Sequence, residues 1–301
     1  MDNNVIKKTN KKKKKYTHLL FIGPHFLIFT VFCLIPLIFG IYISFTRWNM
    51  LGSPQFVGLD NYKEILLNTS STFHDQFTNG LKNTIIFVLL TMPLNIIIPF
   101  LISLAIQAKV KFAGFFQSVF YIPGLFSITA VGLVWSMIFN KDLGPINALL
   151  HTDIVLTHNQ PSAWIAIVVM SLWWGIGGNM VIYIAAIAGV DKGLYEAASI
   201  DGAGRIKKFF YITLPSIKFQ ILYTTVMTVT ACFNIYGQPL MLTKGGPNSS
   251  THVLMMYIRN LAFGKGESIA GIGSAMAMML GIVILVISLT QFKFMNFKGE
   301  D

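Results

Sequence analysis

A short polar stretch at residues 191–218 contains the side chains whose types and spacing best predict a function. Asp191 can accept hydrogen bonds from the backbone N–H groups that open a helix, and Glu196 follows near the positive N-terminal end of that helix. Ala197 and Ala198 keep the helix surface thin enough to enter a groove on another protein. The chemistry that this pattern indicates is the docking of a partner.

The residues after this short helix predict a sharp turn. Gly202 and Gly204 permit a change of backbone direction that other residues disfavour, and Pro215 marks the start of the next helix. The alternative interpretation is an ordinary helix that lies on a membrane surface between two spans.

Catalytic and metal-binding patterns do not occur in the sequence. It has no G-x-x-x-x-G-K-[ST] phosphate loop, no H-E-x-x-H and no paired Cys-x-x-Cys, so neither nucleotide hydrolysis nor metal chemistry is indicated. Cys33 and Cys232 both fall in apolar segments and do not indicate a disulfide framework. A lone histidine in such a segment, His25, is more often a packing residue than a proton carrier. A membrane enzyme therefore lacks its catalytic residues here.

An ion-coupled secondary carrier typically places an ionisable group inside the membrane. All 23 Lys and Arg and all 12 Asp and Glu lie outside the six apolar segments of this chain. Sodium sites built from backbone and hydroxyl oxygens keep the carrier open as an alternative. The pattern favours a transporter whose energy comes from another chain.

The elements that must position the polar stretch are membrane-spanning helices. The 301 residues are 54% hydrophobic and 12% charged, with a mean hydropathy of +0.63, whereas soluble domains are roughly 25% charged. Each of six apolar segments exceeds the ~20 residues that cross a bilayer as a helix, namely 19–45, 83–108, 112–139, 162–190, 219–243 and 270–292. The predicted fold class is all-α integral membrane with six transmembrane helices.

We expect one membrane domain at 16–295, flanked by a basic cytoplasmic tail at 1–15 and a second tail at 296–301. The stretch 56–66 predicts a turn followed by a short amphipathic helix at the membrane surface. Prolines in the spans are tolerated because neighbouring helices satisfy the freed backbone groups. They predict kinks, not breaks, at Pro24, Pro36, Pro93, Pro99, Pro123 and Pro239.

The distribution of basic residues predicts the orientation in the membrane. With the N-terminus inside, 16 of the 23 Lys and Arg face the cytoplasm and 7 face outwards, as the positive-inside rule requires. The polar stretch at 191–218 and both termini are then cytoplasmic. The lysines at 7–15 fit a topology signal near anionic lipid, so the net charge of +11 does not indicate a nucleic-acid partner.

Four motifs along the chain together indicate a family. The first is the E-A-A, D-G-A-G and L-P pattern of the polar stretch, at 196–204 and 214–215. The others are F-V-G-L-D-N-Y at 56–62, Y-I-P at 121–123 and L-T-K-G-G-P-N at 242–248. Together they resemble the permease subunits of ATP-binding-cassette (ABC) importers of the carbohydrate-uptake group, of the maltose, multiple-sugar and glycerol-phosphate type. They occur in that family's order, so the resemblance covers 16–295 and implies the type I importer permease fold.

The resemblance also implies partners and site residues. The partners would be a second homologous permease subunit, ABC ATPase subunits and an extracellular solute-binding protein that delivers a carbohydrate across the bacterial cytoplasmic membrane. ATP and Mg²⁺ would serve the ATPase, and this chain would bind no cofactor or metal. The ATPase-coupling residues would be Glu196, Ala197, Ala198, Asp201, Gly202, Ala203, Gly204, Leu214 and Pro215. The residues that face the binding protein would be Leu242, Thr243, Gly245, Gly246 and Pro247.

A carbohydrate pathway would need aromatic faces and neutral hydrogen-bonding side chains, and the fourth and fifth apolar segments contain both. Each such side chain could equally serve packing or interfacial anchoring. Alignment from the E-A-A and G-G-P motifs places the following residues at positions that resemble the sugar-contacting ones of maltodextrin permeases: Ser171, Trp174, Gly175, Gly178, Thr230, Phe233 and Asn234.

Overall fold

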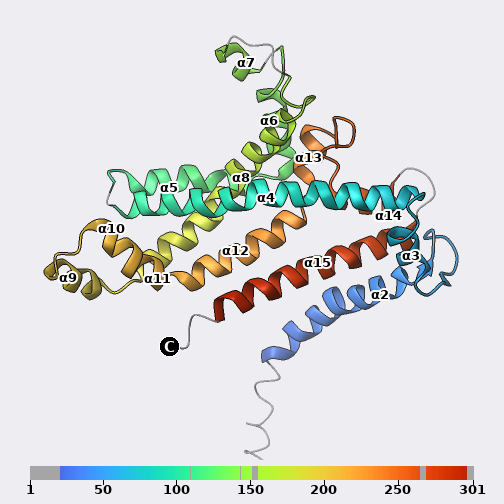
Figure 1. Ribbon diagram of the computed structural model, residues 1–301, viewed down its shortest axis with the longest axis horizontal. Coiled ribbons are helices and arrows are strands. Elements are labelled where there is room, and N and C mark those ends of the chain that lie inside the picture. The colour runs from blue at the N-terminus through green and yellow to red at the C-terminus, as the bar shows by residue number, and fades with distance from the viewer. Residues whose placement is uncertain (1–20, 109, 143, 151–154, 265–268, 297–301) are drawn as a thin grey trace, which may run out of the picture.

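The computed structural model describes residues 21–108, 110–142, 144–150, 155–264 and 269–296, which form a bundle of long helices (Figure 1). The tail at 1–15 and the last residues at 297–301 lie outside this part. Four helices are long and apolar enough to cross a membrane: Phe21–Ser44, Thr72–Gln107, Ser162–Ala188 and Ala270–Lys293. They contain α2 (Ile35–Ser44) with the π-helix η1 (Thr30–Leu34), α4 (Thr72–Gln107), α8 (Ser162–Ala188) and most of α15 (Ala270–Asn296).

The third expected span is broken rather than kinked, so the prediction of a simple kink at Pro123 is wrong. It consists of α5 (Ala113–Tyr121), the 3-10 turn η2 (Ile122–Leu125) and α6 (Ile128–Ile138), with a bend of 104° between the two parts. Hydrogen bonds stabilise the break: Trp174 Nε1 donates to the carbonyl of Phe126 over 3.1 Å, and Ser127 Oγ caps α6. The Phe126 carbonyl, freed by the break, therefore has a partner from α8.

The fifth expected span is also in two pieces, so Pro239 accompanies a break as well. These pieces are α12 (Lys218–Phe233) and α13 (Gly237–Leu242). Asn234 Nδ2 ends α12 by donating to the carbonyl of Thr230 over 2.8 Å. Pro239 then lies in the first turn of α13, where a missing N–H costs nothing because first-turn N–H groups have no partner within the helix.

Two other prolines lie inside α4 without ending it. Pro99 has no N–H to offer the carbonyl of Asn95, four residues earlier. That carbonyl accepts a hydrogen bond from Asn179 Nδ2 of α8 over 2.8 Å. The neighbouring helix thus satisfies the group that the proline leaves free, as expected for a proline in a membrane helix.

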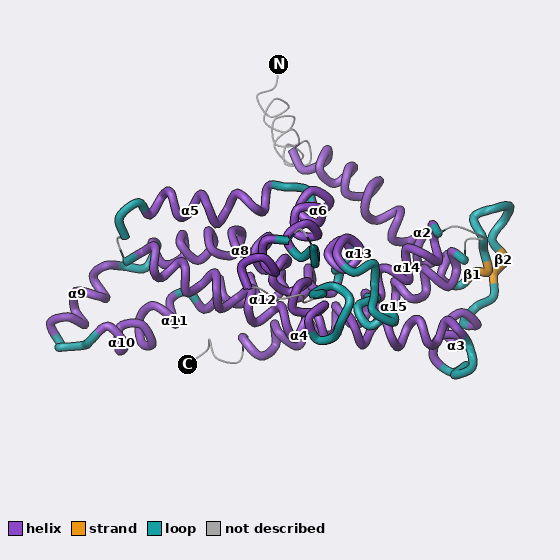
Figure 2. Tube along the Cα trace, turned by 90° about the horizontal axis from the view of Figure 1, so that it is seen from above, coloured by secondary structure: helices purple, strands orange, loops and turns teal. Residues whose placement is uncertain are grey.

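The shorter elements lie at the two ends of the bundle or project from it. Two strands of two residues each form a hairpin, which pairs Thr46 with Phe56 and Arg47 with Gln55 in antiparallel register (Figure 2). A short helix is present where one was expected after it, as α3, and its place at the membrane surface stays a prediction. The remaining bounds are β1 (Thr46–Arg47), β2 (Gln55–Phe56), α3 (Asp60–Leu66), α7 (Pro145–Leu150), α9 (Lys192–Ile200), α10 (Arg205–Lys208), η3 (Phe209–Thr213), α11 (Leu214–Ser216) and α14 (Leu254–Phe263).

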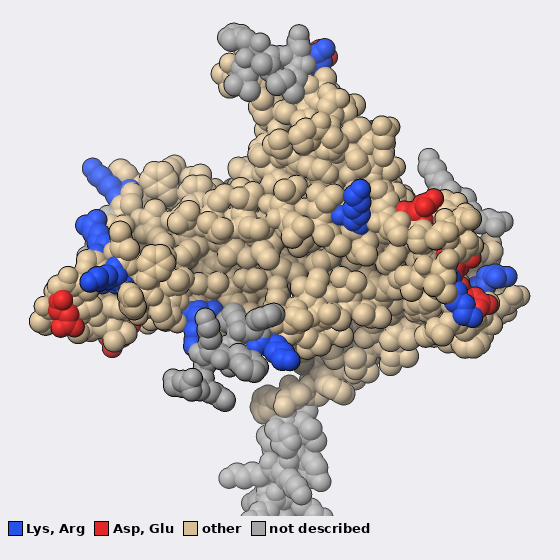
Figure 3. Space-filling model, in the orientation of Figure 1, with Lys and Arg blue, Asp and Glu red and all other residues tan. Residues whose placement is uncertain are grey.

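The packed core lies where α4, α8, α12 and α15 meet, and includes Phe87, Met170, Val229 and Met276. The spanning windows of the long helices are strongly apolar, and only 6–44% of the residues in each window are buried. Much of the apolar surface of these helices is therefore exposed. On the face seen in Figure 3, the surface between α9 and α3 is largely free of charged side chains. An exposed apolar belt of this kind fits contact with lipid.

Candidate functional site

The polar stretch forms a helix-turn-helix that projects from one end of the bundle (Figure 1). Asp191 caps α9 as expected, because its Oδ1 accepts a hydrogen bond from the N–H of Gly193 over 2.8 Å. Glu196 is exposed but is the fifth of the nine residues of α9. Its predicted place near the positive helix N-terminus is therefore wrong, and its carboxylate is free to face a partner.

The turn after α9 is a complete Schellman motif, the hydrogen-bonded C-cap that glycine favours. The N–H of Ala203 bonds to the carbonyl of Ala198 over 2.8 Å, and that of Gly202 to Ser199 over 3.2 Å. Gly202 has a φ of +74°, in the left-handed region, whereas Gly204 is extended. The sharp turn predicted for this pair is confirmed, and Gly202 alone requires the glycine backbone.

One side-chain hydrogen bond ties this helix-turn-helix to the start of the next span, and a second joins α10 to α9. The hydroxyls of Tyr195 and Thr213 are 2.8 Å apart, and Lys208 Nζ donates to Ser199 Oγ over 2.6 Å. Pro215 lies in α11, directly before α12 begins at Lys218, as expected. The Tyr195–Thr213 contact therefore connects α9 to the segment that leads into α12.

The sequence analysis missed an apolar surface on the same segment. Ile200 is 88% exposed, Ile206 is 75% exposed and Tyr211 is 81% exposed, although all three lie within a polar stretch. At this exposure the three side chains are available for contact with a partner. The sequence did contain a signal for these exposed side chains, because Ile200 and Ile206 flank the glycine turn in an otherwise polar stretch.

The G-G-P loop is held against the first turns of α4. Thr251 Oγ1 donates to the carbonyl of Gly246 over 2.7 Å, and Asn83 Nδ2 donates to the carbonyls of Ser249 and His252. Gly245 has a φ of +87°, which explains a glycine there. Leu242 is buried in the core, and Thr243 bonds Thr251. The loop has a fixed shape at the end of α4 remote from α9.

A cleft of 330 Å³ opens between α4, α8 and α12. Four of the seven predicted pathway residues line it: Ser171, Trp174, Gly175 and Gly178. Ser171 donates its hydroxyl to the carbonyl of its own helix at Ile167. The predicted α8 positions are thus brought together on one surface.

The three predicted residues from the fifth apolar segment do not line this cleft. Phe233 is buried in the core and is 3% exposed. Thr230 and Asn234 donate to carbonyls of their own helix, and Asn234 is exposed outside the cleft. The cleft is lined instead by another face of α12, which carries Thr228, Ala231 and Cys232.

Neutral polar side chains that the predicted site did not contain complete the cleft. Asn179 Nδ2 donates to the carbonyl of Asn95 over 2.8 Å and to Thr228 Oγ1 over 3.0 Å. Gln238 of α13 also lines the cleft. Asn95 was detectable in the sequence as an amide in the middle of an apolar span, four residues before a proline. The cleft therefore offers amides, hydroxyls and an indole, and none of its lining residues is charged.

Comparison with known proteins identifies the family of this chain. Residues 67–294 match the family model described as binding-protein-dependent transport system inner membrane component. The arabinooligosaccharides transport system permease protein AraP of Bacillus subtilis is 33% identical, with 95% of this chain and 91% of AraP covered.

Two solved structures share the fold. A bacterial ABC transporter involved in the import of the acidic polysaccharide alginate matches with a TM-score of 0.77 and 22% identity, over 99% of this chain and 100% of that chain. A bacterial alginate ABC transporter in complex with an alginate pentasaccharide-bound periplasmic protein matches with a TM-score of 0.76 and 22% identity, over 94% of each chain. The ion-coupled carrier gains no support from these matches. The chain belongs to the family of binding-protein-dependent transport system inner membrane components, the permease subunits of ABC importers.

Proposed function

We propose that this chain is one of two permease subunits of an ATP-driven importer that moves a saccharide across the bacterial cytoplasmic membrane. The observation that carries the proposal is the projecting α9–α10 segment, with an exposed Glu196 and an apolar surface at Ile200 and Ile206, in a family of transport permeases. The saccharide is supported by AraP, whose name gives arabinooligosaccharides as cargo.

The proposed partners are an ABC ATPase pair, a second homologous permease and an extracellular solute-binding protein. The ATPase would bind ATP and Mg²⁺ and would grip α9 with Glu196, Ala197, Ala198, Asp201, Gly202, Ala203 and Gly204, next to Leu214 and Pro215. The G-G-P loop at Leu242, Thr243, Gly245, Gly246 and Pro247 would face the binding protein. The loop lies at the opposite end of α4 from α9, which supports assigning the binding protein and the ATPase to opposite sides of the membrane.

The hydrogen bonds of α9 suggest how ATPase motion reaches the substrate. Closure of the ATPase pair would displace α9, and the Tyr195–Thr213 contact would pass the displacement to η3 and α11. These elements lead directly into α12, whose Thr228 lines the central cleft. ATP-driven motion would thus rearrange the cleft and alternate its access between the two sides.

The central cleft is the proposed passage for the saccharide. Neutral hydroxyls need partners that donate and accept, and Asn95, Asn179 and Thr228 supply such groups. Trp174 adds an aromatic face that can pack on the apolar side of a sugar ring. Ser171, Gly175 and Gly178 leave room between these groups, whereas Thr230, Phe233 and Asn234 would contribute only if α12 and α13 move.

Reconstitution tests the proposal. Proteoliposomes that contain this chain, the second permease, the ATPase and the binding protein should accumulate the saccharide with ATP inside, and vanadate should stop them. Glu196→Lys should abolish uptake and release the ATPase while the chain stays in the membrane, and Glu196→Gln should retain more uptake than the lysine variant. Accumulation by this chain alone, driven by a proton or sodium gradient, would show that the proposal is wrong.

A further inference from the structure

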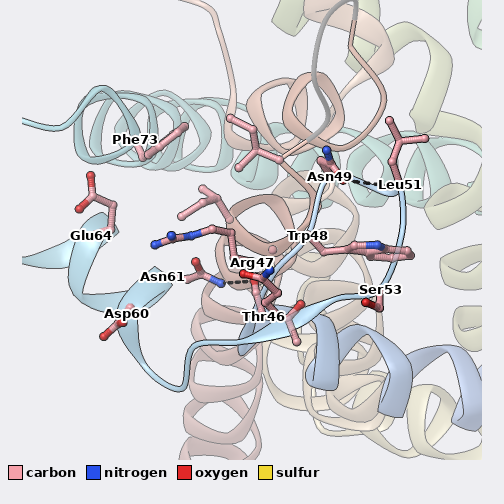
Figure 4. A pocket seen from close by; sticks show the side chains of 14 residues that line it. Thr46, Arg47, Trp48, Asn49, Leu51, Ser53, Asp60, Asn61, Glu64 and Phe73 are labelled. Atoms are coloured by element: carbon pink, nitrogen blue, oxygen red, sulfur yellow. Dashed lines mark hydrogen bonds between the residues drawn. The ribbon is translucent and has the colours of Figure 1, made fainter.

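A second pocket lies at the end of the bundle opposite α9. It has a volume of 720 Å³ and lies between the β1–β2 hairpin, α3 and the start of α15 (Figure 4). This volume is within the roughly 300–1,000 Å³ of typical ligand sites. It shares no lining residue with the central cleft, so it is a separate site.

The walls of this pocket are fixed by hydrogen bonds. Asn61 is buried, and its Nδ2 donates to the carbonyls of Ser44 and Thr46, both over 2.8 Å. The N–H of Ala270 donates to the carbonyl of Trp48 over 3.0 Å and so joins the hairpin to α15. Fixed walls lower the ordering cost of binding a ligand.

Several polar side chains in the pocket have hydrogen-bonding capacity left. Within the described part of the chain, the side chains of Arg47, Ser53 and Gln55 make no hydrogen bond or ion pair. Arg47 reaches from the hairpin towards the side of the pocket where Glu64 lies (Figure 4). Hydrogen bonds from Ser71 and Asn68 lower the pKa of the Glu64 carboxyl below its usual value.

The mixture of charges selects among ligand classes. A carboxylate or phosphate would be attracted by Arg47 but repelled by Glu64 and Asp60, and an amine would be attracted by these two carboxylates but repelled by Arg47. A ligand rich in hydroxyls avoids both penalties because each hydroxyl donates to carboxylates and accepts from the guanidinium. On the other side of the pocket, near Ser53, the half-buried indole of Trp48 offers an apolar ring (Figure 4).

We propose that this pocket binds a neutral saccharide and acts as an accessory substrate site separate from the central cleft. Its placement on the external face rests on the proposed function, because that function sets α9 in the cytoplasm. The site would hold one end of an oligosaccharide near the mouth of the transporter. The groups that would bind the saccharide are the guanidinium of Arg47, the side chains of Ser53 and Gln55, the Glu64 carboxylate and the Trp48 ring.

Calorimetric titration of the permease–ATPase complex in lipid nanodiscs tests this site without ATP or binding protein. The probes are maltotriose and arabinotriose, with trigalacturonate as the acidic comparison. Arg47→Gln and Trp48→Leu should each weaken binding of a neutral probe about 10-fold or more, since each removes a principal contact. Lys82→Gln is the matched control, because Lys82 is an exposed cation outside the pocket and its loss should leave the affinity unchanged.

Two results would overturn the inference. One is unchanged affinity for both neutral probes in the Arg47 and Trp48 variants, or no binding of either probe. The other is tighter, salt-sensitive binding of trigalacturonate, which would make the pocket an anion site. ATP-driven uptake by the same complex, supplied with its binding protein, is measured in parallel. Normal uptake with no binding at this pocket rejects the accessory site alone, whereas absent uptake in the unsubstituted complex rejects the proposed function.

Discussion

At the scale of single residues, the side-chain amide of Asn179 joins three helices. It donates from α8 to the Asn95 carbonyl of α4 and to Thr228 of α12. The Asn95 carbonyl needs this donor because Pro99 cannot supply the usual helical N–H. One amide therefore compensates for a proline and shapes the proposed saccharide passage at the same time.

We expect Asn179→Ala to destabilise the protein by about 1–3 kcal/mol, because it leaves a buried carbonyl without a donor. Pro99→Ala provides an N–H for the same carbonyl, so the double variant should recover part of that loss. Chemical unfolding of the four proteins in detergent gives the coupling energy of this cycle. Strictly additive effects of the two substitutions would contradict the compensation.

At the scale of elements, the turn between α9 and α10 depends on one left-handed residue. Gly202→Ala should cost about 1–2 kcal/mol, because a Cβ is disfavoured at a φ of +74°. Gly204→Ala is the matched control, since Gly204 is extended and a Cβ there would meet nothing within 4 Å. The affinity of the ATPase for the permease should fall about 5- to 30-fold in the Gly202 variant and by less in the Gly204 variant, which keeps the turn geometry. Equal losses in both variants would mean that the turn geometry is not what matters.

The contact between α5 and α8 depends on a close backbone approach. A Cβ on Gly177 would lie 2.6 Å from the Phe120 carbonyl oxygen and from the Cα of Tyr121. Gly177→Ala should therefore destabilise the bundle by about 1–3 kcal/mol through overpacking.

Thermal unfolding in detergent checks this prediction against Gly178→Ala. A Cβ on Gly178 would have open space, with nothing within 4 Å. Only the Gly177 variant should melt at a lower temperature than the parent. If the two variants have the same melting temperature, α5 can move away from α8 without loss of stability.

At the scale of the whole molecule, the bundle has two ends with different proposed partners. α9 and α10 lie at one end, and α3, α14 and the hairpin lie at the other (Figure 1). More than half of the residues in each spanning window of the long apolar helices between them are not buried within the chain. Lipid, the second permease or both must cover this surface, because the chain does not cover it itself.

Cysteine labelling checks the proposed orientation. Both native cysteines are first replaced by serine, and single cysteines are then placed at Ser53 near the hairpin and at Gly204 in the α9–α10 turn; both positions are exposed. In intact cells a membrane-impermeant maleimide should label position 53, and position 204 should react only after permeabilisation. The reverse pattern would place α9 outside and would remove the basis for ATPase coupling.

The sequence by itself determined the membrane class, the location of the apolar segments and the turn between α9 and α10. Hydropathy depends on composition within about 20 residues, and four of the six segments are indeed continuous spanning helices. The turn at Gly202 was predictable because helix caps and left-handed glycines act over a few neighbouring residues. The basic tail, which carried much of the orientation argument, lies outside the described residues.

Only the tertiary structure decided which polar side chains meet and how the third and fifth segments bend. Asn179 contacts residues 84 and 49 positions away, Asn95 and Thr228, so no local pattern could reveal the pairing. A proline frees one carbonyl in any helix, but the outcome depends on the neighbour. Pro99 stays within a continuous helix, where Asn179 supplies a donor to the freed carbonyl, whereas at Pro123 a Trp174 bond stabilises a 104° bend. Packing contacts, which are set by the whole fold, choose between these outcomes.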